Sequence, residues 1–214
     1  MNIEQHPAHP GNYTQGRQGT KVDRIVIHVA DGTYSGTNAW FADPKCDTSA
    51  HYTIAMDGRM ARNVADADTA WHSGLWAMNL RSIGIEHEGQ PSRGPWTPSA
   101  LQLEASAELV ADLCRQFGIP ADREHIIGHF EVIPGRAARA GCPGKTWPWD
   151  AYVKDVQARL NPAPPPAHVP DALDKRSVRL FSASTNTQIG VGTLINGTDK
   201  IYLSPDVEQA LRRK

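Results

Sequence analysis

A proline-rich segment divides this chain into two unequal parts. Residues 161–170 read NPAPPPAHVP, and each proline fixes its own φ angle and lacks the backbone N–H that helices and sheets use. Such a segment favours an extended polyproline-II linker. We therefore predict one domain over residues 1–160 and a small C-terminal module over 171–214, which is too short to bury a large core alone.

The overall composition argues against several classes of protein. Hydrophobic residues make up 40% of the 214, and the formal net charge of −1 favours neither nucleic acid nor an anionic membrane as a partner. No apolar run approaches the ~20 residues that span a bilayer, so stable membrane insertion is not expected. The first residues lack the basic start and apolar stretch of a secretory signal, which predicts synthesis in the cytoplasm. Nothing in the sequence indicates a protein partner.

Periodicity within residues 1–160 predicts an α/β domain. Strands are indicated by short runs of β-branched residues, and Asp57-Gly58 supplies the turn of a hairpin. The expected strands cover 23–30, the two arms of the 50–64 hairpin, 82–89 and 125–129, and the expected helices cover 97–117 and 149–160. This order of elements predicts a mixed central β-sheet flanked by helices.

The helix over 97–117 has clear start and stop signals. Thr97 is a hydroxyl N-cap, Pro98 occupies the first helical position, and Gly118 ends the helix. An apolar stripe at helical spacing should face the core. Its members are Leu101, Ala105, Leu109, Leu113 and Phe117.

Three side chains far apart in the sequence have the chemistry of a zinc site. His28 and His129 each end an apolar, strand-like run, and Cys142 lies in a loop. Burying an imidazole costs free energy unless a metal or a hydrogen bond satisfies it. Two imidazoles and a thiolate suit zinc, and three protein ligands leave one position open for catalysis. A lone histidine is more often structural, so the prediction of a zinc hydrolase requires the three to meet in space.

A zinc hydrolase also needs a general base, and Glu86 is our candidate. Ile83 and Ile85 share one face of the predicted strand, so Glu86 points to the other. A base there would take a proton from water and deliver it to the leaving amine, and partial burial would raise its pKa to a useful value. Glu88 lies on the same face and is the alternative. The two remaining cysteines, Cys46 and Cys114, are predicted to be reduced thiols rather than a disulfide.

Four separated motifs carry a resemblance to a known family. They are IVIHVADG, SAHYTIAMDG, TAWHSGLWAMNLRSIGIEHEG and IIGHFEVIPGRAARAGCPG, within roughly residues 22–150. In this order they resemble the zinc-dependent N-acetylmuramoyl-L-alanine amidases related to peptidoglycan-recognition proteins, which include phage lysins and anhydro-muropeptide amidases. The resemblance implies a mixed sheet with one zinc ion per chain in a groove, at ligand positions that match His28, His129 and Cys142. It also implies that Glu86 is the catalytic acid and base.

Two positions depart from the family's pattern. Many relatives have a catalytic tyrosine where this chain has Ala50, and an oxyanion-stabilising lysine where it has Ala140. Tyr52 is therefore not expected to inherit the tyrosine's role. Arg139 and Lys145 are our candidates for the missing cation, as substrate-binding residues.

The segment AWHSGLWAMN supplies the other predicted substrate contacts. The resemblance favours a groove lined by His72, Trp76 and Asn79, because sugar and peptide binding needs aromatic faces and fixed polar groups. A packed loop that only caps the sheet is the alternative reading. His51 is predicted to support the site from behind or to be purely structural.

The resemblance implies hydrolysis of the amide bond between N-acetylmuramic acid and the L-alanine of the peptidoglycan stem peptide. A non-catalytic module that recognises muropeptides is one alternative, and Cys142 argues against it because non-catalytic relatives typically lack this ligand. A zinc peptidase cutting within the stem peptide is another. Without an export signal, the chain suits a phage endolysin released by a holin or a bacterial recycling amidase. The linker and its appended module, predicted to bind cell wall or to self-associate, favour the endolysin.

Overall fold

The chain divides into two compact units, Met1–Pro162 and Ala163–Lys214. The computed structural model describes residues 1–133, 141–161, 176–181, 188–194 and 201–203. From Pro162 onward the predicted linker lies outside the described residues, so each unit is considered by itself.

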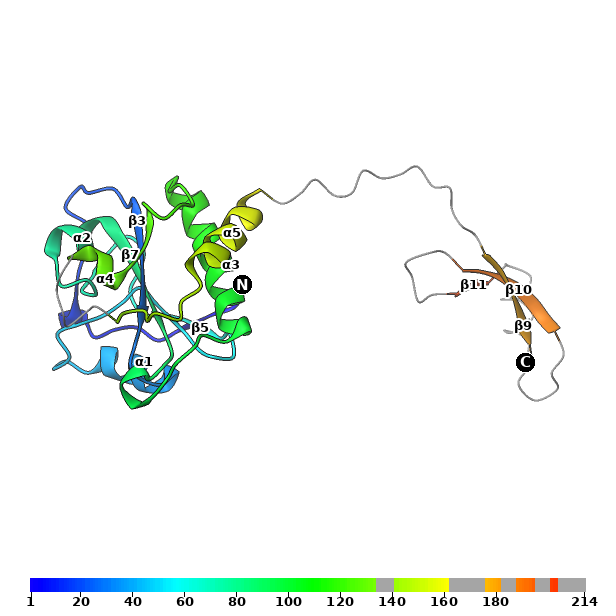
Figure 1. The fold of residues 1–214 in the computed structure, drawn as a ribbon, viewed down its shortest axis with the longest axis horizontal. Coiled ribbons are helices and arrows are strands. Elements are labelled where there is room, and N and C mark those ends of the chain that lie inside the picture. Colours follow the sequence, from blue (N-terminus) through cyan, green and yellow to red (C-terminus); the bar gives the residue numbers. More distant parts are fainter. Residues whose placement is uncertain (134–140, 162–175, 182–187, 195–200, 204–214) are drawn as a thin grey trace. The chain divides into compact units, whose positions relative to one another are not determined.

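The first unit is built on a mixed six-stranded sheet in the order β1-β5-β4-β7-β3-β8 (Figure 1). The β4–β5 pair is the antiparallel hairpin predicted at Asp57-Gly58, and every other neighbouring pair is parallel. A separate antiparallel pair joins β2 (Tyr13–Thr14) to β6 (Thr69–Ala70). The strands of the main sheet are β1 (Ile3–Gln5), β3 (Arg24–Val29), β4 (Tyr52–Ile54), β5 (Met60–Arg62), β7 (Ser82–His87) and β8 (Ile126–Gly128). The mixed sheet predicted from the sequence is confirmed.

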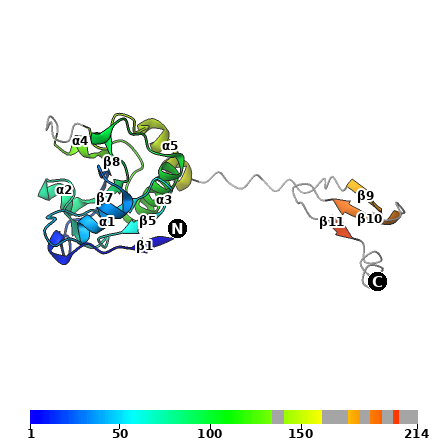
Figure 2. The ribbon, with the colours of Figure 1, turned by 90° about the horizontal axis from the view of Figure 1, so that it is seen from below.

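Helices cover both faces of this sheet. Helices α3 (Ala100–Phe117) and α5 (Trp149–Leu160) pack together on one face. Helices α2 (Trp76–Arg81) and α4 (His129–Val132) lie on the other (Figures 1 and 2). The remaining helices are α1 (Tyr34–Ala42) and two short 3-10 turns, Pro10–Asn12 and Pro91–Arg93.

The alternation of side chains along the central strands decides which residues reach the site. Ile27 of β3 and Ile85 of β7 are fully buried in the core cluster that includes the residues of α3 and α5. Burying such a side chain contributes about 1.5–3 kcal/mol. Val26 packs in a different cluster with Val132 of α4, because successive side chains point to opposite faces. His28 and Glu86 have the same parity as Val26 and Gly84, so the core directs both of them to the α2–α4 face.

Helix α3 differs from the prediction at its first turn. Its N-cap is Ser99, whose hydroxyl accepts from the backbone N–H of Gln102, and not Thr97. Gly118 ends the helix as predicted, with φ at 68°. Leu101 of the predicted apolar stripe is 57% exposed, because the helix rotates Gln102 into the core, where its amide donates to the carbonyl oxygen of Ile54.

Ser99→Ala should therefore destabilise the first unit more than Thr97→Ala. Removing a hydroxyl N-cap costs about 0.5–2 kcal/mol, and Ser99 also donates a hydrogen bond to the Met56 carbonyl oxygen. Thr97 is exposed, so its loss should change the free energy of unfolding by less than ~0.5 kcal/mol. Urea unfolding of both variants measures the difference. A loss in Thr97→Ala as large as that in Ser99→Ala would contradict the assignment of Ser99 as the cap.

The two cysteines outside the predicted metal site are free thiols. Cys46 packs in a small cluster beside Phe41, and Cys114 lies in the main core. Their separation into different clusters is consistent with the predicted reduced state.

The second unit contains an antiparallel three-stranded sheet in the order β11-β10-β9. Its strands are β9 (Arg176–Phe181), β10 (Gln188–Leu194) and β11 (Ile201–Leu203). The role of residues 171–214 stays a prediction. Among the described residues of the whole chain, no helix has the length and apolar character required to cross a membrane.

Candidate metal centre and active-site groove

The structure brings together the three side chains predicted to bind zinc. One ligand atom each from His28, His129 and Cys142 lies within 4.8 Å of the other two. His28 comes from β3, His129 begins α4 directly after β8, and Cys142 lies in the loop before α5. Because β3 and β8 are parallel neighbours, the ends of both strands deliver a histidine to the same edge of the sheet.

The ring of His129 is oriented by a backbone carbonyl. Its Nε2 lies 3.1 Å from the carbonyl oxygen of Ser73, and a carbonyl can only accept, so Nε2 carries the hydrogen. In the neutral ring the lone pair is then on Nδ1, which faces Nδ1 of His28 at 3.0 Å. A histidine held in this way presents a nitrogen of the kind that metals bind.

Cys142 is held beside the two imidazoles by backbone contacts. The N–H of Val29 donates to its Sγ at 3.3 Å, and Sγ is 3.9 Å from Nδ1 of His28. The N–H of Phe130 in turn donates to the Cys142 carbonyl oxygen at 3.1 Å, which ties this loop to α4. Donation to sulfur favours the thiolate, the form that coordinates metal.

Glu86 stands next to this cluster because β3 and β7 pair in register, His28 opposite Glu86. Its side chain is 16% exposed, and its Oε1 is 3.8 Å from Nδ1 of His28. Oε2 is buried and has no hydrogen-bond partner among the described residues. Burial raises the pKa of the Glu86 carboxyl to about 8, and a cation bound nearby would lower that pKa again.

The alternative carboxylate, Glu88, is engaged elsewhere. Its Oε2 accepts from the N–H of Met56 at 2.9 Å, and it does not line the groove that contains Glu86. The geometry therefore favours Glu86 over Glu88 as the group beside the cluster.

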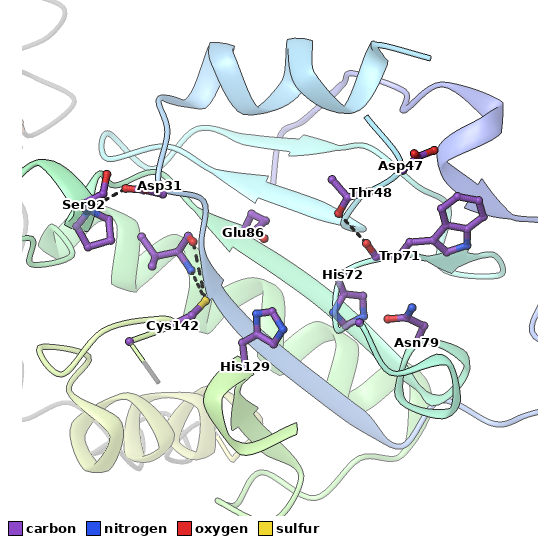
Figure 3. A pocket seen from close by; sticks show the side chains of 14 residues that line it. Asp31, Asp47, Thr48, Trp71, His72, Asn79, Glu86, Ser92, His129 and Cys142 are labelled. Carbon is purple, nitrogen blue, oxygen red and sulfur yellow. Dashed lines mark hydrogen bonds between the residues drawn. The ribbon is translucent and has the colours of Figure 1, made fainter. Parts of the chain in front are cut away.

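A groove of about 720 Å³ opens over these side chains. Figure 3 shows His72, Glu86, His129 and Cys142 around one hollow. The lining residues are Val29, Asp31, Asp47, Thr48, Trp71, His72, Gly74, Asn79, Glu86, Pro91, Ser92, His129, Gly141 and Cys142.

The predicted substrate contacts are only partly brought together. His72 and Asn79 line the groove. Trp76 is the first residue of α2; it is 43% exposed and does not line the groove. Lys145 lines a separate cavity of about 280 Å³, which shares only Gly141 with the groove. Arg139 lies outside the described residues, as does Ala140.

His72 and Asn79 are both held from behind. His72 is 7% exposed, with Nδ1 at 3.0 Å from Nε2 of His28 and Nε2 at 3.1 Å from the Ser82 hydroxyl. The Asn79 side-chain oxygen accepts from the N–H of Ser73 at 2.9 Å. This bond holds the same residue whose carbonyl orients His129.

His51 lies deeper in the fold. It is fully buried, its Nδ1 accepts from the N–H of Gly84, and its Nε2 is 2.8 Å from the guanidinium of Arg17. Burial and the nearby cationic Arg17 hold the pKa of His51 well below its usual range, so the ring stays neutral. His51 supports β7 from within rather than facing the groove.

Sequence reasoning missed several lining residues, among them Thr48 and Asp31, whereas Trp71 belongs to the segment AWHSGLWAMN that supplies the predicted substrate contacts. Thr48 and Trp71 are joined by a hydrogen bond from the Thr48 hydroxyl to the Trp71 carbonyl oxygen, 2.8 Å long. Asp31 accepts from the N–H of Ser92 at 3.1 Å, which links the loop after β3 to the loop after β7. Asp31 lies three residues after His28, just beyond the end of β3, and this position was the available signal. Thr48 comes from a loop with no local signal.

Comparison with known proteins places these features in context. The model of the N-acetylmuramoyl-L-alanine amidase family matches residues 18–145. N-acetylmuramoyl-L-alanine amidase A of Achromobacter lyticus is 31% identical over 163 residues, 69% of this chain and 89% of that protein. The 1,6-anhydro-N-acetylmuramyl-L-alanine amidase AmpD of Haemophilus influenzae is 30% identical over 51% of this chain and 59% of its own length. A solved mutant endolysin from Bacillus subtilis shares the fold, with a TM-score of 0.57 at 21% identity over 73% of this chain and 99% of that one.

Proposed function

Because this chain belongs to the N-acetylmuramoyl-L-alanine amidase family, we propose that it hydrolyses the amide bond between N-acetylmuramic acid and L-alanine in peptidoglycan. The observation that carries this proposal is the meeting of His28, His129 and Cys142 beside the buried carboxylate of Glu86. The groove above them, about 720 Å³, is in the size range of sites that bind small ligands.

The donor set fits one zinc ion per chain. Two imidazole nitrogens and a thiolate are donors that zinc prefers, and three protein ligands are typical of catalytic zinc. We propose that His28, His129 and Cys142 hold the ion. Glu86 is not part of this group of three, so its carboxylate is left for proton transfer. When bound, zinc supplies Lewis acidity, which acidifies water and polarises a carbonyl group.

The residues of the chain would then perform two proton transfers. Glu86 accepts a proton from the water whose oxygen attacks the lactyl carbonyl carbon. Glu86 then delivers that proton to the nitrogen of L-alanine, which lets the carbon–nitrogen bond break and the amine leave. A carboxylate in a largely buried site is suited to both steps, because its pKa is raised toward neutrality.

The substrate contacts in the groove are proposed from their positions. Asn79 offers a rigid amide, Trp71 contributes an aromatic face, and His72 forms part of the wall. Trp76, Arg139 and Lys145 stay predictions, with Lys145 placed in the adjoining cavity beyond Gly141.

We propose a lytic role on the cell wall, after the chain leaves the cytoplasm through a holin-type pore. The appended second unit supports this reading over muropeptide recycling, because a module beyond the catalytic domain suits binding to an insoluble wall. A recycling enzyme acts instead on small soluble fragments and needs no such module.

Digestion of purified sacculi tests the bond that is cleaved. We expect released peptides with a free N-terminal L-alanine and intact glycan strands, both identified by mass spectrometry, and no release in the presence of a chelator. New D-amino-acid or diaminopimelate ends would instead identify a peptidase. Binding to sacculi with no new ends would identify a recognition module.

The same assay separates the two biological roles. A lytic enzyme should digest intact sacculi at least as fast as soluble anhydro-muropeptides at equal bond concentration. A strong preference for the soluble fragments would favour recycling.

A further inference from the structure

We propose that His72 is a positioning residue that, together with Ser82, fixes the tautomer of His28 so that its Nδ1 faces the metal site. This inference rests on the proposed zinc function, and it assigns His72 to the support of a ligand rather than to polar contact with substrate. The series of hydrogen bonds that sets the tautomer begins at the hydroxyl of Ser82.

The Ser82 hydroxyl has one hydrogen, and its direction is determined by a carbonyl. Ser82 Oγ lies 2.6 Å from the carbonyl oxygen of Met78, which can only accept, so the hydroxyl donates to it. The same Oγ lies 3.1 Å from Nε2 of His72. With its hydrogen already used, Oγ must accept there, so Nε2 of His72 carries a hydrogen.

The second step passes from His72 to His28. In the neutral ring of His72, a hydrogen on Nε2 leaves a lone pair on Nδ1. That Nδ1 lies 3.0 Å from Nε2 of His28, so Nε2 of His28 donates to it. The lone pair of His28 is then on Nδ1, the atom that faces Nδ1 of His129 at 3.0 Å and Sγ of Cys142 at 3.9 Å.

Two independent routes thus give both histidines the same tautomer. His129 is set by the carbonyl oxygen of Ser73, and His28 by the sequence Met78, Ser82, His72. Both rings direct lone-pair nitrogens into one space, and such an arrangement is stabilised by a cation between them.

Strand β7 leaves the space that the His72 ring occupies. A Cβ atom on Gly84 would come within 2.4 Å of the His72 ring, so the ring occupies the space that a side chain at position 84 would fill. Ser82, two residues earlier on the same face, is thereby opposite Nε2 of the ring. Both ring nitrogens are engaged from behind, which leaves only ring carbons for the groove.

Two variants of equal shape isolate the nitrogen that accepts from His28. Leucine and asparagine have the same branched outline, but only asparagine offers an oxygen near the position of Nδ1. We expect His72→Leu to weaken zinc affinity by about 10- to 100-fold, the range typical of groups that orient metal ligands. His72→Asn should recover most of that loss. Competition with a chromogenic chelator measures the affinities.

Ser82→Ala tests the first step, with Ser106→Ala as its matched control. Ser106 is also a buried serine bonded to a buried histidine, because its Oγ is 2.8 Å from Nε2 of His87. Ser82→Ala should weaken zinc affinity by about 10-fold, the low end of the same range. Ser106→Ala should leave it unchanged, although both lose one hydroxyl.

Nitrogen-15 NMR of the histidine rings in the metal-free wild-type chain tests the tautomer directly, without any variant. We expect His72 to carry its hydrogen on Nε2 and its lone pair on Nδ1. A hydrogen on Nδ1 of His72 would overturn the proposal, as would wild-type zinc affinity in His72→Leu. A wild-type chain that binds no zinc would contradict the proposed function instead, while the NMR result still decides the tautomer.

Discussion

Glu86→Gln is expected to lower the rate of amide hydrolysis by about 10²- to 10⁴-fold, the contribution typical of a positioned acid–base group. This corresponds to roughly 3–5 kcal/mol of activation free energy. Glutamine keeps the shape of the side chain but cannot accept a proton from water or deliver one to the leaving nitrogen. Zinc content should stay at the wild-type level, because the three proposed ligands are untouched. Steady-state kinetics on soluble muropeptide and metal analysis measure both effects.

Glu88→Gln is the matched control for this experiment. Glu88 lies two residues after Glu86, just beyond the end of β7. Unlike Glu86, its carboxylate accepts a hydrogen bond from the Met56 N–H. Its amide variant can keep that bond through the side-chain oxygen, so near-wild-type rates are expected. If Glu86→Gln were fully active while Glu88→Gln was not, the assignment of the base would have to move to Glu88.

Cys142→Ala is expected to remove both zinc and activity while the fold persists. Loss of the thiolate leaves two imidazoles, too few to hold zinc tightly against a chelator. Losing the metal removes several kcal/mol of transition-state stabilisation, so hydrolysis should fall by orders of magnitude. Cys142 is only half-buried in a loop, and the core does not depend on it. The free energy of unfolding of the Cys142→Ala variant should therefore match that of the metal-free wild-type chain.

Cys46→Ala provides the control thiol. Cys46 is buried in a separate cluster with Phe41, and it is not part of the histidine–cysteine group. Metal analysis should show wild-type zinc for this variant and little for Cys142→Ala. Unchanged zinc in Cys142→Ala would take that residue out of the ligand set.

Much of the first unit could be predicted because its signals are local. The run of β-branched residues before His28, the Asp57-Gly58 turn and the stop at Gly118 each act through the conformational preferences of a few neighbouring residues. The start of α3 could not be placed, since Thr97 and Ser99 are both good N-caps. Tertiary packing decides between them, because Ser99 donates a hydrogen bond to the Met56 carbonyl oxygen and Gln102 is buried in the core.

The candidate site was predictable only in part for the same reason. Ligand chemistry pointed to His28, His129 and Cys142, and strand alternation pointed Glu86 away from the core. The choice between Glu86 and Glu88 needed the register of β7 against β3 and the contact of Glu88 with Met56. Trp76 is exposed and does not line the groove, because the direction of a side chain at a helix start depends on how that helix docks; its contact with substrate stays a prediction.

The sequence by itself determined the chemistry available to this protein: two histidines and a cysteine with zinc-binding character, a carboxylate on the polar side of a strand, and a mixed sheet to carry them. Only the tertiary structure decided that β3 and β8 deliver both histidines to one edge, and that Ser82 and His72 lie behind His28. These are contacts between residues 10 to 114 positions apart. Their hydrogen bonds depend on atomic positions to within tenths of an ångström. Tertiary packing sets these positions, and no local sequence pattern encodes them.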